Sequence, residues 1–236
     1  MLFRRKRKKS NTLARNLVVH EDPKSIVSEQ FRTIRTNIKF SMPDDELKTI
    51  VVTSASIKEG KSTVSANIAG VFAQEGKKVL IIDGDMRKPT VHYTFTLQNV
   101  MGLSNLLTRQ CTIQEAIQET DIEGLSVITS GPIPPNPAEL LASKQMGIVM
   151  GMLKEEFDLI IFDAPPVLSV TDAQILSNKC DATILIVNAG ETQKNAIVKA
   201  KELLDLSKAD IIGVIMNNIN LKKKDYYYYQ YYGQAE

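Results

Sequence analysis

The sequence is poor in the residues that make metal centres and disulfide frameworks. Its 236 residues include only two cysteines and two histidines, and none of the four has ligand-like spacing: Cys111, Cys180, His20 and His92. No apolar run approaches the ~20 residues needed to cross a bilayer. The basic N-terminus also lacks the apolar segment of a secretory signal. We therefore expect a cytoplasmic protein with reduced thiols.

Positive charge is scarce outside the N-terminus. The formal net charge is only +2, and residues 1–22 hold seven of the 29 Lys and Arg residues against two of the 27 acidic ones. The rest of the chain carries about −3, so its body is not a polyanion-binding surface. A basic arm of this kind suits an anionic membrane surface, a nucleic acid or bulk solvent, and composition leaves these three interpretations open.

Apolar runs typical of buried strands alternate with helical patterns along the chain. The expected strands cover residues 50–52, 79–82, 125–129, 159–163, 183–187 and 211–216. The expected helices cover residues 24–40, 64–72 and 196–206, with short helices over 102–120. With 43% hydrophobic and 24% charged residues, the chain suits one large α/β domain. The order predicts a mostly parallel, twisted sheet with helices on both faces.

The stretch TIVVTSASIKEGKST, residues 49–63, carries the strongest motif. An apolar strand breaks into a small-residue loop that ends in Gly-Lys-Ser-Thr, and a helical pattern follows. This is the context of a P-loop NTPase, whose loop amides and helix N-terminus bind polyphosphate. The pattern has glycine where this chain has alanine, so the match is imperfect. The expected nucleotide-binding residues are Ala55, Ser56, Ile57, Lys58, Glu59, Gly60, Lys61, Ser62 and Thr63.

Two further expected strands end in carboxylates. Asp83 and Asp85 follow the strand 79–82, and the strand pleat puts them on one side. Asp163 ends the next such run, as the Walker B aspartate that orients Mg²⁺ does. In open α/β sheets, ligands bind at the carboxyl ends of the strands. Close carboxylates beside a P-loop favour metal or proton chemistry over the turn that Asp-Gly also forms.

The helix expected over residues 24–40 has an apolar stripe and a charged face. The stripe consists of Val27, Phe31, Ile34 and Ile38. The charged residues, three apart and off that stripe, are Glu29, Arg32 and Arg35. Composition alone favours solvent over a subunit contact for this face.

Residues 221–236 concentrate the aromatic side chains. Six of the seven tyrosines lie there: Tyr226, Tyr227, Tyr228, Tyr229, Tyr231 and Tyr232. Consecutive rings cannot all face one core in a helix or a strand, so many must be exposed. Such a tail can stack on a partner, or it can accept phosphate groups that each add about −1.5 to −2 charge.

These features resemble the bacterial tyrosine kinase (BY-kinase) family. Within it, they resemble the separate kinases that Gram-positive bacteria pair with a membrane adaptor in capsule or exopolysaccharide synthesis. The resemblance covers nearly the whole chain and rests on the P-loop, the D-x-D-x-R element at 83–87, the strand 160–163 followed by Ala-Pro, and the terminal tyrosines. Residues 29–35 match the family's E-x-x-R-x-x-R oligomerisation motif, which reverses the preference for solvent. Ile57 and Lys58 stand where relatives commonly carry Pro-Gly.

The resemblance implies an ATP- and Mg²⁺-dependent protein-tyrosine kinase that phosphorylates its own C-terminal cluster in trans, and other proteins. The implied catalytic residues are Lys61, Asp83, Asp85 and Arg87. Asp83 is expected to accept the tyrosine proton, and Arg87 to hold the two aspartates or to contact a neighbouring subunit. The implied metal ligands are Ser62, Asp85 and Asp163. Asn217 matches the position that meets adenine in related ATPases.

The implied organisation has three parts: a basic arm (1–22), a tyrosine kinase domain with its oligomerisation helix (23–220), and the tyrosine-rich tail (221–236). The implied partners are a transmembrane adaptor that recruits the chain to the inner face of the cell membrane, further copies in a ring, a protein-tyrosine phosphatase and protein substrates of polysaccharide synthesis. No nucleic acid is expected among them.

Two other functions are compatible with the sequence. A positioning or partitioning ATPase of the same fold hydrolyses ATP to switch between monomer and dimer. Such proteins usually carry a second lysine early in the P-loop, where this chain has Ser56. A non-catalytic binding module, whose tail only recruits partners, is the third possibility.

Overall fold

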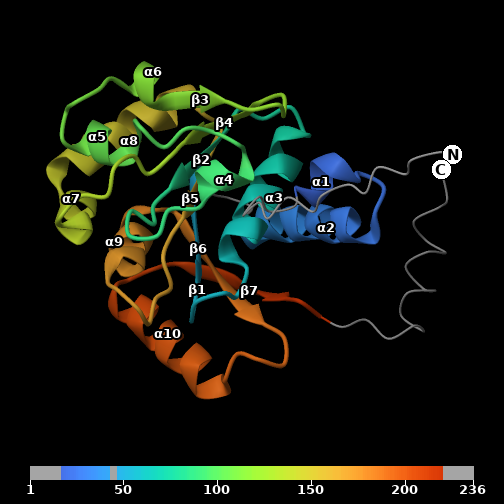
Figure 1. Cartoon of the computed structure of the whole chain (residues 1–236). Coiled ribbons are helices and arrows are strands. Elements are labelled where there is room, and N and C mark those ends of the chain that lie inside the picture. Colours follow the sequence, from blue (N-terminus) through green and yellow to red (C-terminus); the bar gives the residue numbers. More distant parts are fainter. Residues whose placement is uncertain (1–16, 43–46, 220–236) are drawn as a thin grey trace, which may run out of the picture.

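The computed structural model describes residues 17–42 and 47–219 (Figure 1). The strands are β1 (Thr49–Ser54), β2 (Val79–Asp83), β3 (Ile117–Glu119), β4 (Leu125–Ile128), β5 (Leu159–Asp163), β6 (Ala182–Asn188) and β7 (Ile211–Asn217). The helices are α1 (Val18–Glu21), α2 (Ile26–Ser41), α3 (Lys61–Ala73), α4 (Val91–Thr94), α5 (Leu103–Leu107), α6 (Ile113–Ala116), α7 (Pro137–Ala142), α8 (Lys144–Glu156), α9 (Asp172–Lys179) and α10 (Lys194–Leu206).

One seven-stranded sheet organises the chain. Its order is β3-β4-β2-β5-β1-β6-β7, and all neighbours are parallel except β3 and β4. The central strands β1, β2 and β5 are buried along their whole length. Strands covered on both faces need continuous apolar runs, which is why the sequence shows runs there rather than alternation. The expected mostly parallel α/β sheet is confirmed.

Helices cover both faces of this sheet (Figure 1). α1, α2 and α3 pack on one face over Ile50 and Val52, and α8, α9 and α10 pack on the other over Val51. Alternate side chains of β1 therefore pack into two separate apolar cores, one on each face of the sheet. Within the described ranges, none of the helices has the length and apolar character of a membrane span.

The end of the expected basic arm is part of the packed structure. Val19 of α1 is fully buried, and its N–H donates to Asn67 Oδ1 at 3.1 Å. An added Cβ at Gly70 of α3 would lie 2.7 Å from Val19 Cγ2, so glycine allows α1 to approach this closely. Residues 17–22 thus continue the domain on its N-terminal side.

Two local expectations are wrong. Residues 117–119 do not belong to a short helix but form the edge strand β3, which pairs antiparallel with β4. Three residues are too few to show a strand period. On α2, Val27 is 45% exposed and does not extend the buried stripe. The neighbouring Ser28 is fully buried instead, and its hydroxyl donates to the carbonyl of Asp22 at 2.7 Å, so this contact carries no hydrophobic signal.

Candidate functional site

The carboxyl ends of three adjacent strands meet at one edge of the sheet. Register aligns Val52 of β1 with Asp163 of β5, and Asp163 with Asp83 of β2. Because β5 lies between β1 and β2, Asp163 sits between the P-loop and the D-x-D-x-R segment. Parallel strands end on the same edge, where ligands of open α/β sheets bind.

The backbone of the P-loop has two left-handed residues. Gly60 has φ +87°, and an added Cβ there would lie 2.1 Å from Asn217 Nδ2, so both conformation and space require glycine. Lys58 has φ +64°, a glycine-like conformation at the place where relatives are expected to carry Pro-Gly. Ala55 is fully buried without a positive φ, so alanine serves where the motif has glycine.

Glu59 ties the P-loop to the ends of β6 and β7. It is only 4% exposed; its Oε2 accepts the N–H of Ser56 at 2.9 Å and its Oε1 accepts the hydroxyl of Thr192 at 2.6 Å. The Glu59 carbonyl accepts from Asn217 Nδ2 at 3.0 Å. Thr192 Oγ1 in turn accepts the N–H of Asn188 at 2.7 Å. The side chain expected to meet adenine is therefore fixed on the P-loop itself.

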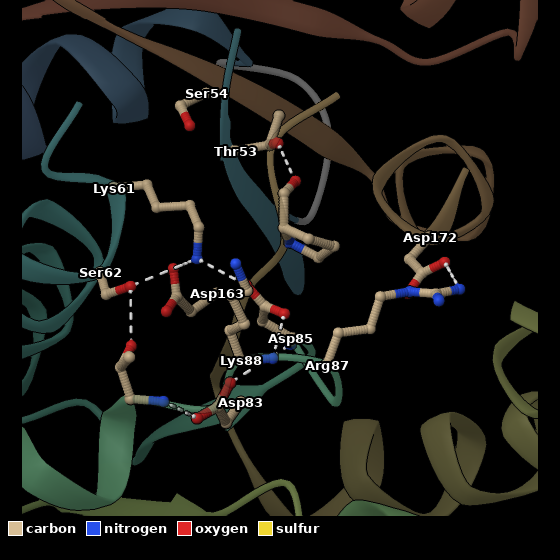
Figure 2. Close-up of polar contacts among 12 residues, drawn as sticks. Thr53, Ser54, Lys61, Ser62, Asp83, Asp85, Arg87, Lys88, Asp163 and Asp172 are labelled. Atoms are coloured by element: carbon tan, nitrogen blue, oxygen red, sulfur yellow. Dashed lines mark hydrogen bonds and ion pairs between the residues drawn. The ribbon is translucent and has the colours of Figure 1, made fainter. Parts of the chain in front are cut away.

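Lys61 lies at the centre of the site (Figure 2). Its Nζ is 3.4 Å from both Asp163 Oδ1 and Asp85 Oδ2, and it donates to Ser62 Oγ at 3.3 Å. Burial opposes its charge, but Asp163, Asp85 and Asp83 outweigh this and raise the pKa of Lys61 above its ordinary value. The lysine is a cation held among carboxylates.

Asp83 is fully buried and held by backbone amides. Its Oδ2 accepts the N–H groups of Thr90 and Val91 at 2.9 Å each, and its Oδ1 accepts the N–H of Asp85 at 3.2 Å. Burial and the nearby Asp163 raise the pKa of Asp83 to about 7, although the Val91 amide and Lys61 act in the opposite direction. A carboxyl with a pKa near 7 is matched to proton transfer at neutral pH. Because these amides occupy Oδ2 of a fully buried side chain, we expect a substrate to reach it only after the Lys88–Val91 segment moves.

Asp163 and Ser62 fit a magnesium ion bound with nucleotide. Asp163 Oδ1 contacts Lys61 and accepts the Ser65 hydroxyl at 3.3 Å, whereas its buried Oδ2 has no hydrogen-bond partner among the described residues. A metal ion or its water satisfies such an oxygen. Across 17–42 and 47–219, no three His, Cys, Asp or Glu side chains form a metal cage. Mg²⁺ needs none, because one or two carboxylates, phosphates and waters suffice.

Arg87 turns away from the two aspartates that precede it in sequence. Its Nε and Nη2 donate to Asp172 Oδ2 and Oδ1 at 2.9 and 3.0 Å (Figure 2). Asp172 is fully buried in the first turn of α9. The expectation that Arg87 holds the Asp83/Asp85 pair is therefore wrong. Asp172 was missed because an acid in the first turn of a helix is common and carries no functional signal.

Comparison with known proteins places these features in one family. A family profile described as an AAA domain matches residues 47–210. The tyrosine-protein kinase YwqD of Bacillus subtilis is 47% identical over 231 residues, which are 98% of this chain and 97% of the relative. The putative tyrosine-protein kinase CapB of Staphylococcus aureus is 45% identical over 227 residues, 96% of this chain and 99% of the relative. The chain belongs to the bacterial tyrosine kinase family.

Solved structures agree with this assignment. The chimerical protein CapA2B2 matches with a TM-score of 0.84 at 45% identity, covering 88% of this chain and 93% of the other. The kinase domain of the Escherichia coli tyrosine kinase ETK matches with a TM-score of 0.82 at 30% identity, covering 92% and 88%. The septum site-determining protein MinD of Pyrococcus horikoshii, complexed with Mg-ADP, has a TM-score of 0.64 at 23% identity over 75% and 73%. The positioning ATPases thus share the fold and are more distant than the tyrosine kinases.

The E-x-x-R-x-x-R segment of this bacterial tyrosine kinase lies on α2, and its charged residues differ in exposure. Glu29 and Arg32 form an ion pair and have side chains 56% and 29% exposed. Arg35 is 17% exposed; its Nη1 donates to the carbonyl of Val71 at 2.7 Å, and its Nε lies 3.3 Å from Glu75 Oε1. Within one subunit Arg35 therefore braces α2 against α3.

Several residues expected in the kinase lie outside the described part of the chain. They are the arm residues 1–16 and the tail tyrosines Tyr226, Tyr227, Tyr228, Tyr229, Tyr231 and Tyr232. A residue that sequence reasoning missed is Thr90. Its hydroxyl donates to Ser62 Oγ at 3.2 Å and its N–H to Asp83, so it joins the metal side of the site to the buried carboxylate. The only sequence signal for it was the preceding proline, which indicates a turn.

Proposed function

We propose that the chain transfers the γ-phosphoryl group of ATP to tyrosine hydroxyls, those of its own C-terminal cluster in a neighbouring copy and those of other proteins. The observation that carries this proposal is the convergence of four residues from the start of α3 and the carboxyl ends of β2 and β5: Lys61, Asp83, Asp85 and Asp163. Phosphoryl transfer depends on positioning and charge neutralisation, which such a cluster supplies beside a P-loop.

Lys61 and the loop amides provide the positive charge. Lys61 forms ion pairs with Asp85 and Asp163. With ATP bound, the ammonium turns to the β- and γ-phosphates, and the amides of residues 55–63 hold the phosphate oxygens. Mg²⁺, held by Ser62, Asp85 and Asp163, would neutralise charge on the same oxygens. Asn217 would meet adenine; its bond to the Glu59 carbonyl, which holds it beside the P-loop, supports this role.

The tyrosine oxygen forms its bond to the γ-phosphorus as the bond from that phosphorus to the bridging oxygen breaks, and ADP leaves with the electron pair. Asp83 takes the phenol proton. A free tyrosine has a pKa of about 10, while the pKa of Asp83 is about 7. A loose transition state makes modest demands on the base, so this difference in pKa still allows Asp83 to accept the proton. The phenol enters where the Lys88–Val91 segment opens.

The acceptor tail reaches a neighbour through assembly. Glu29, exposed on α2, and the half-buried Arg32 are the expected contacts of a ring, with Arg35 supporting the helix. Each phosphate adds about −1.5 to −2 charge, so a phosphorylated tail is repelled by a site lined with aspartates and the ring loosens. A protein-tyrosine phosphatase removes the phosphate groups from the tail. A transmembrane adaptor, aided by the basic arm, brings the kinase to the inner face of the membrane. There the kinase acts on proteins of polysaccharide synthesis.

A Lys61→Met variant tests the function. We expect mass spectrometry to find phosphotyrosine on the tail of the wild-type chain incubated with Mg-ATP, and none on the variant. Lys78→Met, an exposed lysine outside the site, is the matched control and should keep full labelling. Phosphotyrosine that persists in purified Lys61→Met refutes the proposal. If the wild-type chain hydrolyses ATP without forming phosphotyrosine, the positioning-ATPase alternative is supported. If the wild-type chain does neither, a binding module is supported.

A further inference from the structure

Helix α8 has an outer face that no other described element covers. Its inner face lies in the core through Met146, Val149, Met150 and Leu153. Its outer face consists of residues three and four positions apart, and all of them are exposed: Lys144, Gly147, Ile148, Gly151, Met152 and Glu155. Ile148 and Met152 are large apolar residues exposed by 52% and 53%. The helix lies on the opposite side of the sheet from α2 (Figure 1).

The two glycines of this face are not required by the fold of the subunit. An added Cβ at Gly147 or Gly151 would meet nothing within 4 Å, and neither residue has a positive φ. Glycine inside a helix is destabilising relative to alanine, so two of them one turn apart weaken α8. They also leave two hollows beside the side chains of Ile148 and Met152. Hollows next to protruding side chains suit the close approach of a second helix.

The face is complementary to a second copy of itself. In an antiparallel pair centred between Val149 and Met150, Ile148 faces Gly151 of the second copy and Met152 faces Gly147. Each protruding side chain then meets a hollow. The same antiparallel arrangement places Lys144 of each copy opposite Glu155 of the other, so opposite charges meet at both ends of the helix pair. A twofold axis makes each of these contacts twice, as an isologous interface requires.

The charges at the ends of α8 support this occupant. Lys144 is the first residue of the helix and Glu155 lies in its last turn, where the helix dipole disfavours a cation and an anion respectively. Neither side chain has an ion pair within the described residues. In the antiparallel pair each charge meets the opposite charge and the opposite end of the neighbouring dipole. An apolar or uniformly charged partner lacks this match.

We propose that α8 is a homotypic docking surface, through which two copies pair helix to helix about a twofold axis. A stable complex buries about 1,200–2,000 Å² of surface, and one helix pair buries less, so this contact is weak by itself. It becomes effective where another contact concentrates the copies. Since α2 and α8 cover opposite faces of the sheet, the pairing is compatible with assembly through α2 and joins two such assemblies.

Charge reversal tests the pairing in the full chain. Sedimentation velocity over a concentration series should show reversible self-association of the wild type. Lys144→Glu and Glu155→Lys should each weaken it about three- to tenfold, since each puts like charges at both ends. The double variant K144E/E155K should regain wild-type association, and an equimolar mixture of the two single variants should associate more strongly than either alone. Gly151→Leu should weaken association more than either reversal, because it fills the hollow.

Controls separate this contact from the one expected on α2. Lys199→Glu and Glu202→Lys reverse exposed charges on α10 and should leave association unchanged. Glu29→Ala should lower assembly through α2 and leave the response to the α8 variants intact. Phosphotyrosine formation should remain in all α8 variants, so failure of the pairing is distinguishable from failure of the kinase proposal. A wild type without α8-dependent association, or a double reversal as weak as the single ones, overturns the inference.

Discussion

Arg87 and Asp172 are joined by two hydrogen bonds, from Nε at 2.9 Å and from Nη2 at 3.0 Å, so the D-x-D-x-R segment is tied to the start of α9. The carboxylate is fully buried, while the guanidinium side chain is 41% exposed. Gly84 lies close to the same helix, since an added Cβ there would be 2.8 Å from Leu176 Cδ1 of α9. The segment that carries Asp85 is thus positioned by a helix that follows a different strand.

Removal of the arginine should destabilise the fold. Arg87→Ala leaves the buried Asp172 charge uncompensated and should lower the free energy of unfolding by about 2–4 kcal/mol, somewhat less than for a fully buried pair because the guanidinium is partly solvated. Urea unfolding at pH 7 measures the change. The exposed pair Lys201–Asp205 is the control, and Lys201→Ala should change stability by about 0.5 kcal/mol or less. An equally small effect of Arg87→Ala would show that the pair is not structural.

The raised pKa of Asp83 predicts a pH dependence of phosphoryl transfer. A base works only when deprotonated, and kcat/KM reports the pKa of the free enzyme, so kcat/KM for Mg-ATP should rise with pH through about 7 and then level off. Asp83→Asn should lower the rate about 10²–10⁴-fold, the usual contribution of a positioned base. It should also abolish the rise with pH. A rise of the same size in Asp83→Asn assigns the titration to another group.

The same group should make the nucleotide-free protein more stable in mild acid. The pKa of Asp83 is raised from 3.8 to about 7 on folding, so the folded state binds more protons between these values. Stability linked to Asp83 therefore falls as pH rises through this window, the reverse of a salt-bridged carboxylate. Unfolding free energies at pH 5.5 and 7.5 measure it, and Asp83→Asn should show a smaller drop than the wild type.

Arg32 and Arg35, two arginines of one motif, should behave differently. Arg35 bonds to the Val71 carbonyl of α3 and pairs with Glu75, whereas Arg32 pairs with Glu29 on its own helix and donates to the carbonyl of Pro23, just before α2. Arg35→Ala should lower both the melting temperature of the subunit and its assembly. Arg32→Ala should lower assembly and lower the melting temperature less than Arg35→Ala does, because its pair with Glu29 is more exposed and does not join α2 to α3. Calorimetry and sedimentation on the same samples test this, and equal losses of melting temperature contradict it.

The part of the structure predictable from the sequence is the part with local signals. Central parallel strands are buried on both faces, so 50–52, 79–82 and 159–163 appeared as continuous apolar runs. The P-loop was recognisable because strand, loop and helix are contiguous. That Asp83, Asp85 and Asp163 lie near Lys61 followed from the rule that ligands bind at strand ends, although the strand order that puts β5 between β1 and β2 has no local signal.

What the sequence did not predict depends on contacts between distant segments. The partner of Arg87 is 85 positions away, and its choice of Asp172 follows from the docking of α9. Arg35 turns to α3 because the Val71 carbonyl and Glu75 lie there, which no helical periodicity encodes. The brace between Glu59 and Thr192 spans 133 positions and likewise depends on the strand order.

That brace should set the affinity for nucleotide. Thr192→Val keeps the shape of the side chain but leaves the buried Glu59 Oε1 without its 2.6 Å hydrogen bond. Leaving a buried acceptor unsatisfied costs about 1–3 kcal/mol. The Glu59 carbonyl also accepts the hydrogen bond from Asn217, so the side of the site expected to bind adenine loosens with the loop. We expect KM for ATP to rise about five- to thirtyfold with kcat nearly unchanged, because Lys61 and the aspartates keep their contacts.

Matched variants make this prediction specific. Thr192→Ser restores the hydroxyl and should recover most of the affinity for ATP. Thr36→Val is the control: this exposed threonine of α2 lies outside residues 29–35, its hydroxyl bonds to the Arg32 carbonyl of its own helix, and the change should leave KM unchanged. Inorganic triphosphate, which lacks adenine, should bind Thr192→Val with a smaller loss than ATP if the brace acts through Asn217. An equal loss for both ligands means that Glu59 supports only the phosphate side of the loop.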